Sequence, residues 1–314
     1  MKLRILFMGT PDFALFSLKR LVESDDEVVG VVTQPDKPKG RGYTLTPPPV
    51  KVFAETQGIP VYQPTTLKGD DFAALLSDIA PDMIVVAAYG KILPKNVIDY
   101  PRYGCINVHG SYLPEYRGAA PMQRAIIDGC EYTGVTIMKM DVGLDTGDMI
   151  TRKKTKINID DNFEDIHDRL GNEGAELLIE TVKLIKEGKD TPEKQDGSLA
   201  TYAAKIEKSD CEIDFSMPSK KVHDLIRGLS PIPLGFTKTS DGKMLKIVSS
   251  RLSERSAEQK EVGTVVSLDG GVITVVCSDG CIDITAVLPE GKRKMPAADF
   301  IRGRGIAVGD KLGV

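Results

Sequence analysis

The chain of 314 residues has no tryptophan, only three histidines and only five cysteines. The cysteines are odd in number and scattered, which argues against a disulfide framework of the secreted type. Their use predicts a reducing compartment, the cytoplasm. Cys277 and Cys281 lack a second cysteine pair or nearby histidines, so we expect no bound metal.

Long hydrophobic runs are missing as well. No run approaches the roughly 20 apolar residues that a membrane-spanning helix needs, and residues 1–9 lack the cleavage site of a signal peptide. The formal net charge of -4 argues against a general nucleic-acid coat protein, although it does not exclude local basic patches. With 41% hydrophobic and 27% charged residues, the chain has the composition of a folded protein of two domains or one large one.

The first part of the chain alternates apolar strands with amphipathic helices. The strands are nearly continuous apolar runs, which is typical of strands buried on both faces of a sheet. This order predicts an α/β domain with a Rossmann-like, doubly wound parallel sheet and helices on both faces. The expected strands cover Leu3–Met8, Val28–Val32, Val61–Tyr62, Met83–Ala88 and Cys105–Val108, and the expected helices cover Phe13–Val22, Val50–Gln57, Phe72–Ile79 and Phe163–Lys186.

The second part of the chain has a different pattern. A helix over Ser219–Leu229 is followed by strand-like runs that are joined at Asp-Gly dipeptides, a strong hairpin signal. This pattern predicts a small β-barrel of the OB-like type. Residues 189–206 are polar and unpatterned, as in a linker. We therefore expect a first domain at residues 1–188, a linker at 189–206 and a C-terminal β-barrel domain at 207–314.

Residues 34–49 form a loop that is long for a compact sheet domain. Lys37, Lys39 and Arg41 outweigh Asp36 in charge, and two glycines let the backbone approach a partner closely. The loop suits a phosphate-rich partner, but a loop that is simply solvated explains it equally well.

Asn107 and His109 end a buried strand. Their spacing of two residues places both side chains on the same face of that strand. Active sites of parallel sheets gather at the carboxyl ends of the strands. We therefore expect these two side chains to be catalytic, whereas His167 and His223 lie on amphipathic helices and are expected to be structural or surface groups.

A carboxylate is needed to orient the imidazole of His109. Asp141, Asp145 and Asp148 lie in one glycine-containing loop after an apolar strand, and the sequence pattern leaves the choice among them open. An Asn, a His and an Asp suit carbonyl chemistry, because the amide can stabilise an oxyanion and the imidazole can accept a proton. No Gly-x-Ser-x-Gly sequence is present, so direct transfer without an acyl-enzyme is the simpler hypothesis.

Several long motifs are similar to those of the folate-dependent formyltransferases. The first set is His109-x-Ser-x-Leu-Pro-x-x-Arg-Gly118 together with Leu144-Asp-Thr-Gly-Asp148. A second set resembles the members of that family that act on methionyl-tRNA, and the resemblance runs nearly end to end. It comprises Gly9-Thr-Pro-Asp-Phe-Ala14, the 34–49 loop, Leu199-Ala-Thr-Tyr-Ala203 and the run from Gly291 to Gly305.

The resemblance implies a reaction and a site. The formyl donor is 10-formyltetrahydrofolate, and the acceptor is the α-amino group of methionyl initiator tRNA. By matching positions, Asn107 and His109 would hold the oxyanion, and Asp145 would pair with His109. The family pattern further assigns the folate site to Ser111, Tyr112, Leu113 and Pro114. It assigns contact with the tRNA to the loop that carries Lys37, Lys39 and Arg41 and to the C-terminal β-barrel.

The sequence departs from the family pattern at two places. Tyr112 stands where the family usually has Leu, and Pro231-Ile-Pro-Leu-Gly235 stands where it often has Pro-Trp-Pro-Gly-Ala. Two other hypotheses share the first domain: a 10-formyltetrahydrofolate hydrolase, and a formyltransferase that acts on a small amine such as a sugar nucleotide. A non-catalytic RNA-binding protein is a third. We expect a monomer.

Overall fold

The computed structural model describes residues 2–39, 44–257 and 260–313. The described residues form two compact units, and each unit is built from several pieces of the chain. The first unit comprises residues 1–118, 134–155 and 167–202, and the second comprises residues 119–133, 156–166 and 203–314. This grouping differs from the expected division at residues 188 and 206, which stays a prediction about domain boundaries. No helix of the described residues is both long enough and apolar enough to span a membrane.

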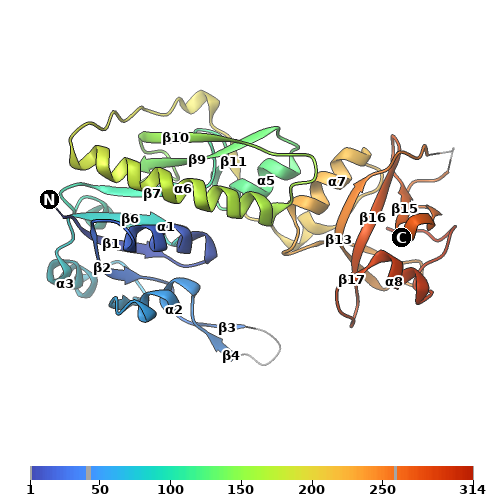
Figure 1. Ribbon diagram of the computed structural model, residues 1–314, viewed down its shortest axis with the longest axis horizontal. Helices are drawn as coiled ribbons and strands as arrows, with labels where there is room; N and C mark the ends of the chain where they lie inside the picture. The colour runs from blue at the N-terminus through green and yellow to red at the C-terminus, as the bar shows by residue number, and fades with distance from the viewer. Residues whose placement is uncertain (1, 40–43, 258–259, 314) are drawn as a thin grey trace. The chain divides into compact units, whose positions relative to one another are not determined.

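The first unit is built on a seven-stranded sheet (Figure 1). The strands pair in the order β10-β9-β7-β6-β1-β2-β5. The pairs from β7 to β5 are parallel, and β9 is antiparallel to β7. The parallel sheet expected from the sequence is thus confirmed, with an antiparallel addition beside β7. The strands are β1 Arg4–Gly9, β2 Glu27–Val32, β5 Val61–Tyr62, β6 Met83–Ala87, β7 Cys105–His109, β9 Tyr132–Lys139 and β10 Met149–Lys156.

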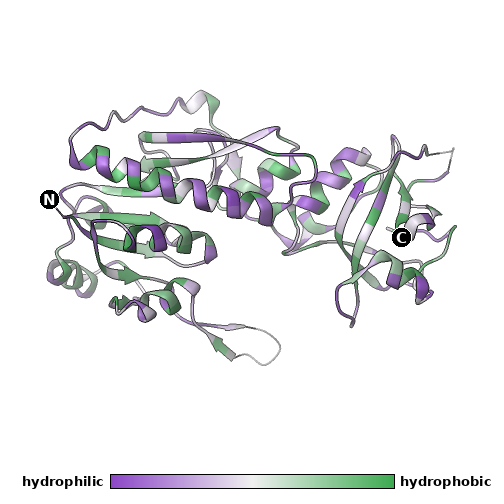
Figure 2. Cartoon of the chain, in the orientation of Figure 1, coloured by the Kyte–Doolittle hydropathy of each residue, from purple (hydrophilic) through white to green (hydrophobic). Residues whose placement is uncertain are grey.

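Helices cover this sheet because its strands are apolar on both faces, as the green central strands of Figure 2 show. The α3 residues Phe72 and Leu76 join one buried cluster with Leu6 and Ile84 of the sheet. Helix α6 lies close to β7 of the sheet, because a Cβ added at Gly174 of α6 would lie 3.1 Å from a methyl carbon of Val108. The helices of this part of the chain are α1 Asp12–Val22, α2 Pro49–Thr56, α3 Asp70–Ile79, α4 Lys95–Ile98 and α6 Phe163–Lys186.

Two small strand pairs complete this part of the chain. Strands β3 Lys37–Lys39 and β4 Thr44–Thr46 form an antiparallel hairpin in the expected long loop. Strands β8 Arg117–Gly118 and β11 Tyr202–Ala203 form a separate two-stranded sheet, and a short 3-10 helix at Gly197–Leu199 lies just before β11.

The second unit contains the antiparallel sheet that the Asp-Gly turns predicted. Its strands pair in the order β12-β13-β16-β15-β14, with β17 added on β16, and α7 and α8 pack on this core. The elements are α5 Pro121–Ile127, a 3-10 turn at Lys208–Cys211, α7 Ser219–Gly228, β12 Gly235–Lys238, β13 Met244–Leu252, β14 Val265–Ser267, a 3-10 turn at Asp269–Gly271, β15 Ile273–Val276, β16 Cys281–Pro289, β17 Met295–Pro296 and α8 Ala297–Arg302.

Tyr89, just after β6, is a buried tyrosine with an unsatisfied hydroxyl. Its side chain is 2% exposed and packs in the cluster that also holds Leu93 and Val97. Its hydroxyl finds no hydrogen-bond partner within the described part of the chain. Burial raises the pKa of Tyr89 to about 12 from the usual 10.0, because the phenolate would lose its hydration.

We expect Tyr89→Phe to flatten the loss of stability at alkaline pH. Below pH 10 both the folded and the unfolded state keep the Tyr89 proton; above it, the unfolded state releases a proton that the folded state retains, so the free energy of unfolding falls. The change between pH 10 and pH 12 attributable to Tyr89 is about 2 kcal/mol. Urea unfolding of the two proteins across this range measures it. The control Tyr202→Phe, at a side chain that is 68% exposed, should follow the wild type; equal pH slopes for wild type and Tyr89→Phe would contradict the prediction.

Candidate active site

Strand β7 places Asn107 and His109 on one face of the sheet, as their spacing predicted. Val108, between them, lies against Gly174 of α6, so its two neighbours point to the opposite face. Asn107 pairs in register with Val86 of the parallel strand β6, and His109 pairs with Thr136 of β9. Both side chains are nearly buried, at 9% exposure for Asn107 and 6% for His109.

The imidazole of His109 lies between two acceptors. Its Nε2 is 3.1 Å from the carbonyl oxygen of Tyr116. Its Nδ1 is 3.7 Å from Oδ1 of Asp145, within ion-pair distance when the ring is protonated. Since carbonyl and carboxylate oxygens only accept, the ring can donate to both only when both nitrogens carry protons.

The structure brings Asp145, rather than Asp141, to His109. The backbone N–H of Gly118 donates to Oδ2 of Asp145 over 2.8 Å, which fixes the carboxylate. Asp141 is held elsewhere, because its carboxylate accepts from Thr146 Oγ1 at 2.7 Å and from the N–H of Gly143 at 2.9 Å. Of the aspartates that the sequence pattern left open, Asp145 thus lies at ion-pair distance from the ring, and its role stays a prediction.

The side-chain amide of Asn107 makes no hydrogen bond to any described residue of the chain. An amide at the carboxyl end of a parallel strand, beside a buried imidazole, is free to donate to a ligand oxygen. A preorganised donor of this kind stabilises negative charge that develops on a carbonyl oxygen.

The segment after β7 is pinned by buried hydrogen bonds. Ser111 and Leu113 have no exposed surface, and the Ser111 hydroxyl donates to the carbonyl of Glu115 at 2.6 Å. Thr136 of β9 ties the two together, because its Oγ1 donates to the Ser111 carbonyl at 2.8 Å and accepts from the Leu113 N–H at 3.1 Å. Ser111 and Leu113 therefore hold the loop in place by buried contacts.

Tyr112 and Pro114 are partly exposed. The guanidinium of Arg152 lies 4.9 Å from the centre of the Tyr112 ring, and it also donates to the carbonyl of Leu113 at 3.0 Å and to Glu193 at 2.8 Å. Of the four residues predicted to contact folate, Tyr112 and Pro114 thus offer surface to a ligand. Their role stays a prediction.

Sequence reasoning missed two residues that border this site. Arg117 is 6% exposed, and its guanidinium donates to the amide oxygen of Gln195. Gln195 lies in the polar stretch 189–206 that was read as a linker, where no periodicity could reveal a contact. Within the first unit this stretch is tied down: Glu193 also exchanges two backbone hydrogen bonds with Met149.

The predicted tRNA-contact residues lie on the β3–β4 hairpin, apart from Arg41, which is outside the described residues. Lys37 is exposed on β3, and Lys39 ends the same strand. Asp36, the one acid of the loop, accepts hydrogen bonds from Gln63 and Lys51, which lower its pKa. Asp36 also forms an ion pair with Lys51. The charge of Lys37 is therefore not paired with an acid among the residues that the structure describes.

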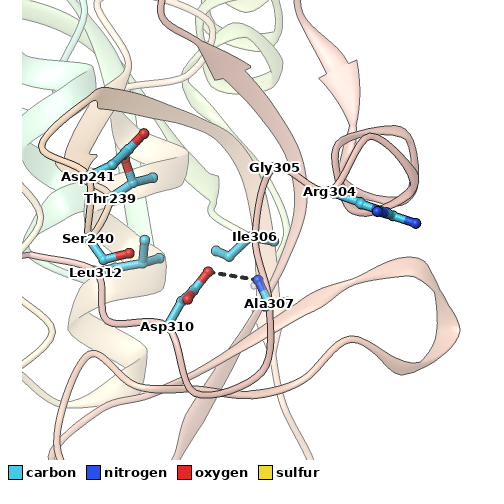
Figure 3. Close-up of a pocket in the computed structure, with 9 residues that line it drawn as sticks. All are labelled: Thr239, Ser240, Asp241, Arg304, Gly305, Ile306, Ala307, Asp310 and Leu312. Carbon is cyan, nitrogen blue, oxygen red and sulfur yellow. Dashed lines mark hydrogen bonds between the residues drawn. The ribbon is translucent and has the colours of Figure 1, made fainter.

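A shallow hollow of about 250 Å³ in the second unit contains none of the predicted site residues (Figure 3). Asp310, which lines it, accepts from the N–H of Ala307 at 2.7 Å, and Arg304 points away from the other lining side chains. Among the residues that the structure describes, no group of three His, Cys, Asp or Glu side chains could hold a metal ion.

The chain matches two family descriptions. Residues 1–182 match the family described as formyl transferase, and residues 205–305 match its C-terminal domain. The methionyl-tRNA formyltransferase of Geotalea daltonii is 49% identical over 311 residues, which cover 99% of this chain and 98% of that protein. The methionyl-tRNA formyltransferase of Bacillus licheniformis is 46% identical, with the same two coverages.

Solved structures share the fold at low sequence identity. The N-formyltransferase from Helicobacter canadensis, in complex with folinic acid and dTDP-3-aminofucose, has a TM-score of 0.66 at 20% identity, over 90% of this chain and 98% of that one. HypX from Aquifex aeolicus has a TM-score of 0.68 at 19% identity over 98% of this chain, which spans only 48% of that longer chain.

We expect Gly147→Ala to destabilise the loop that carries Asp145. A Cβ at Gly147 would overlap the carbonyl oxygen of Lys139, a backbone atom with no freedom to move aside. The loss should be at least about 2 kcal/mol in the free energy of unfolding, as for overpacking at a rigid position, and urea denaturation measures it. Gly197→Ala is the matched control, since nothing lies within 4 Å of a Cβ there. Equal stability of the two variants would show that the loop is not packed as described.

Proposed function

Because the chain belongs to the formyl transferase family, we propose that it transfers the formyl group of 10-formyltetrahydrofolate to the α-amino group of methionyl initiator tRNA. The observation that carries the proposal is the buried Asn107–His109 pair on β7 with Asp145 at the ring nitrogen. The relatives support the choice of acceptor, because they match both parts of the chain and are named for methionyl-tRNA.

The reaction forms one bond and breaks one. A bond forms between the α-amino nitrogen of methionine and the formyl carbon, and the bond from that carbon to N10 of the folate breaks. One proton leaves the amine, and one ends on N10, so that the products are the formamide and tetrahydrofolate. The donor supplies a carbonyl carbon; the chain has to orient it, stabilise charge on its oxygen and handle the amine proton.

Asn107 and His109 carry out two of these tasks, and Asp145 supports His109. The free amide of Asn107 donates to the oxygen on which negative charge develops, an effect worth roughly 3 kcal/mol. His109 holds or moves a proton next to that oxygen. General acid–base catalysis of this kind contributes about 10²–10⁴-fold to the rate. Asp145 orients the ring, because its Oδ1 lies 3.7 Å from Nδ1.

The proposal for the folate subsite rests on accessible surface near this group. Tyr112 and Pro114 are partly exposed beside β7, and Val142 and Leu144, at 69% and 58% exposure, flank Gly143 in the loop that leads to Asp145. Apolar and aromatic surface around a few placed polar groups suits a flat heterocycle. All five cysteines are free thiols, which fits the cytoplasm as the place of action.

Comparing acceptors tests the proposed function directly. Formyl transfer from 10-formyltetrahydrofolate is measured with methionyl initiator tRNA, with free methionine and with water as the only acceptor. The proposal expects transfer with the charged tRNA alone. Release of tetrahydrofolate without charged tRNA would favour the hydrolase or a small-amine formyltransferase, and binding of tRNA without any folate turnover would favour an RNA-binding protein.

We expect the three polar residues to control the rate of that transfer. Asp145→Asn, which keeps the shape but removes the charge, should lower kcat by about 10²-fold or more, and His109→Ala by about 10²–10⁴-fold. Asn107→Ala should lower it by about 10²–10³-fold. Single-turnover formylation measures the rates, and circular dichroism checks the fold. The control Asp160→Asn, at a side chain that is 78% exposed, should be unchanged; a folded His109→Ala protein with near-wild-type turnover would refute the catalytic assignment.

The hairpin charge should act on tRNA binding and not on chemistry. Lys37→Ala is expected to raise KM for charged tRNA by about 2- to 10-fold and to reduce the slope of log KM against log salt by about one, because one phosphate contact is lost. The rate at saturating tRNA should stay the same. Lys68→Ala, an exposed lysine away from the hairpin, is the control. An unchanged KM and salt slope for Lys37→Ala would remove the hairpin from the tRNA interface.

A further inference from the structure

Gln195 bridges a buried arginine and the backbone of the loop that carries Asp145. Its Nε2 donates to the carbonyl of Asp145 and to the carbonyl of Gly147, both at 2.8 Å. Its Oε1 accepts from Nε of Arg117 at 3.0 Å and from Nη2 at 2.7 Å. All four side-chain contacts are complementary, so the amide has one orientation: its oxygen faces a group that only donates, and its nitrogen faces groups that only accept.

Arg117 makes this orientation rigid. Its side chain is 6% exposed, so little water is available to replace a lost hydrogen-bond partner of its charge. Its own N–H donates to the carbonyl of Thr201 at 2.9 Å, which fixes the residue from the backbone side. Hydrogen bonds from a charged donor are stronger than those between neutral groups, so the contact with Arg117 fixes the side chain of Gln195.

The backbone conformation of Asp145 requires stabilising contacts of this kind. The φ of Asp145 is 51°, in the left-handed region that side chains adopt at a cost. A conformation of this kind persists only where neighbouring contacts over-determine it. The carbonyl bonds from Gln195 act on Asp145 and, two residues on, on Gly147, so they clamp the chain on both sides of Thr146.

The clamp bears on the distance between Asp145 and His109. At 3.7 Å, Nδ1 and Oδ1 are close enough to interact but are not locked to each other by a short hydrogen bond. Among the residues that the structure describes, the other carboxylate oxygen accepts only from the N–H of Gly118, the residue next to Arg117. Two connected contacts therefore set the position of the carboxylate. Gly118, next to Arg117, donates to its Oδ2, and Gln195, held by Arg117, donates to the Asp145 carbonyl.

We propose that Gln195 is a positioning residue: held by Arg117, it fixes the backbone of Asp145 so that the carboxylate stays at Nδ1 of His109. This inference rests on the proposed function, because the consequence for catalysis follows from the role given to Asp145. It assigns a task in the site to the polar stretch 189–206.

The test replaces one amide NH₂ by an oxygen. In Gln195→Glu the new carboxylate can still accept from Arg117, but its second oxygen faces the two carbonyls that the amide had served, and acceptors repel one another. We expect kcat for formyl transfer to fall about 10- to 100-fold, as for a small misplacement of a catalytic group, with KM for charged tRNA changed less than about two-fold. Gln57→Glu is the matched control on the exposed end of α2 and should be unaffected. Gln195→Met, which keeps the length and adds no charge, replaces the first variant if that does not fold.

A double-mutant cycle separates positioning from a general structural effect. If Gln195 acts through Asp145, then Gln195→Glu should change kcat by less than about two-fold when Asp145 is already Asn. A full additional loss in the Asp145→Asn protein would overturn the proposal, and so would wild-type kcat in folded Gln195→Glu.

Amide hydrogen exchange, which needs no turnover, distinguishes failure of the proposed role of Gln195 from failure of the proposed function. Displacing the Asp145 carboxylate weakens its bond from Gly118, so the amide hydrogen of Gly118 should exchange at least about 10-fold faster in Gln195→Glu than in the wild type. Faster exchange in a protein that transfers no formyl group to tRNA would refute the proposed function and leave the clamp standing. Unchanged exchange would refute the clamp whatever the activity.

Discussion

The imidazole of His109 is held between the carbonyl of Tyr116 and the carboxylate of Asp145, and the rest of the site is arranged around this placement. A ring with an acceptor oxygen near each nitrogen is held in one orientation. His109 is the last residue of strand β7, and because its side chain is buried, little water competes for its hydrogen bonds. At the end of this strand the side-chain amide of Asn107 makes no hydrogen bond within the described residues, so it is available to a ligand.

Both acceptors come from segments with unusual backbone. Tyr116 and Asp145 each have a positive φ, 58° and 51°, and each is stabilised by contacts to residues 195–201: the Tyr116 N–H donates to Thr201 Oγ1 at 2.8 Å, and the Asp145 carbonyl accepts from Gln195. Strain at two positions that meet at one imidazole is typical of a functional site, where packing elsewhere holds a geometry that the local chain disfavours.

The sequence predicted those parts of the molecule that follow a periodicity. The spacing of Asn107 and His109 placed both side chains on one face of their strand, because side chains alternate along a strand. The apolar runs predicted a parallel sheet, because strands buried on both faces are apolar throughout. The Asp-Gly turns likewise predicted the antiparallel sheet of the second unit. Asp145 was singled out only by resemblance, since three aspartates shared its loop.

The contacts of residues 189–206 were not predictable in this way. Gln195 reaches Arg117 and Asp145 across 78 and 50 positions of sequence, and a hydrogen bond over such a distance leaves no local pattern. A polar stretch without periodicity was therefore interpreted as a linker, although its polarity serves to satisfy backbone carbonyls and a buried guanidinium. The contact of the Arg152 guanidinium with the Tyr112 ring leaves no local sequence pattern either.

The most direct test of the account is the protonation of His109, observed by ¹⁵N NMR of the imidazole nitrogens. With only three histidines in the chain, the signal is assigned by its loss in His109→Ala. The account predicts that Nε2 carries a proton in every charge state of the ring, because it donates to the Tyr116 carbonyl, and that Asp145→Asn alters the Nδ1 signal more than the Nε2 signal. A neutral ring with its proton on Nδ1 and a bare Nε2 would contradict it.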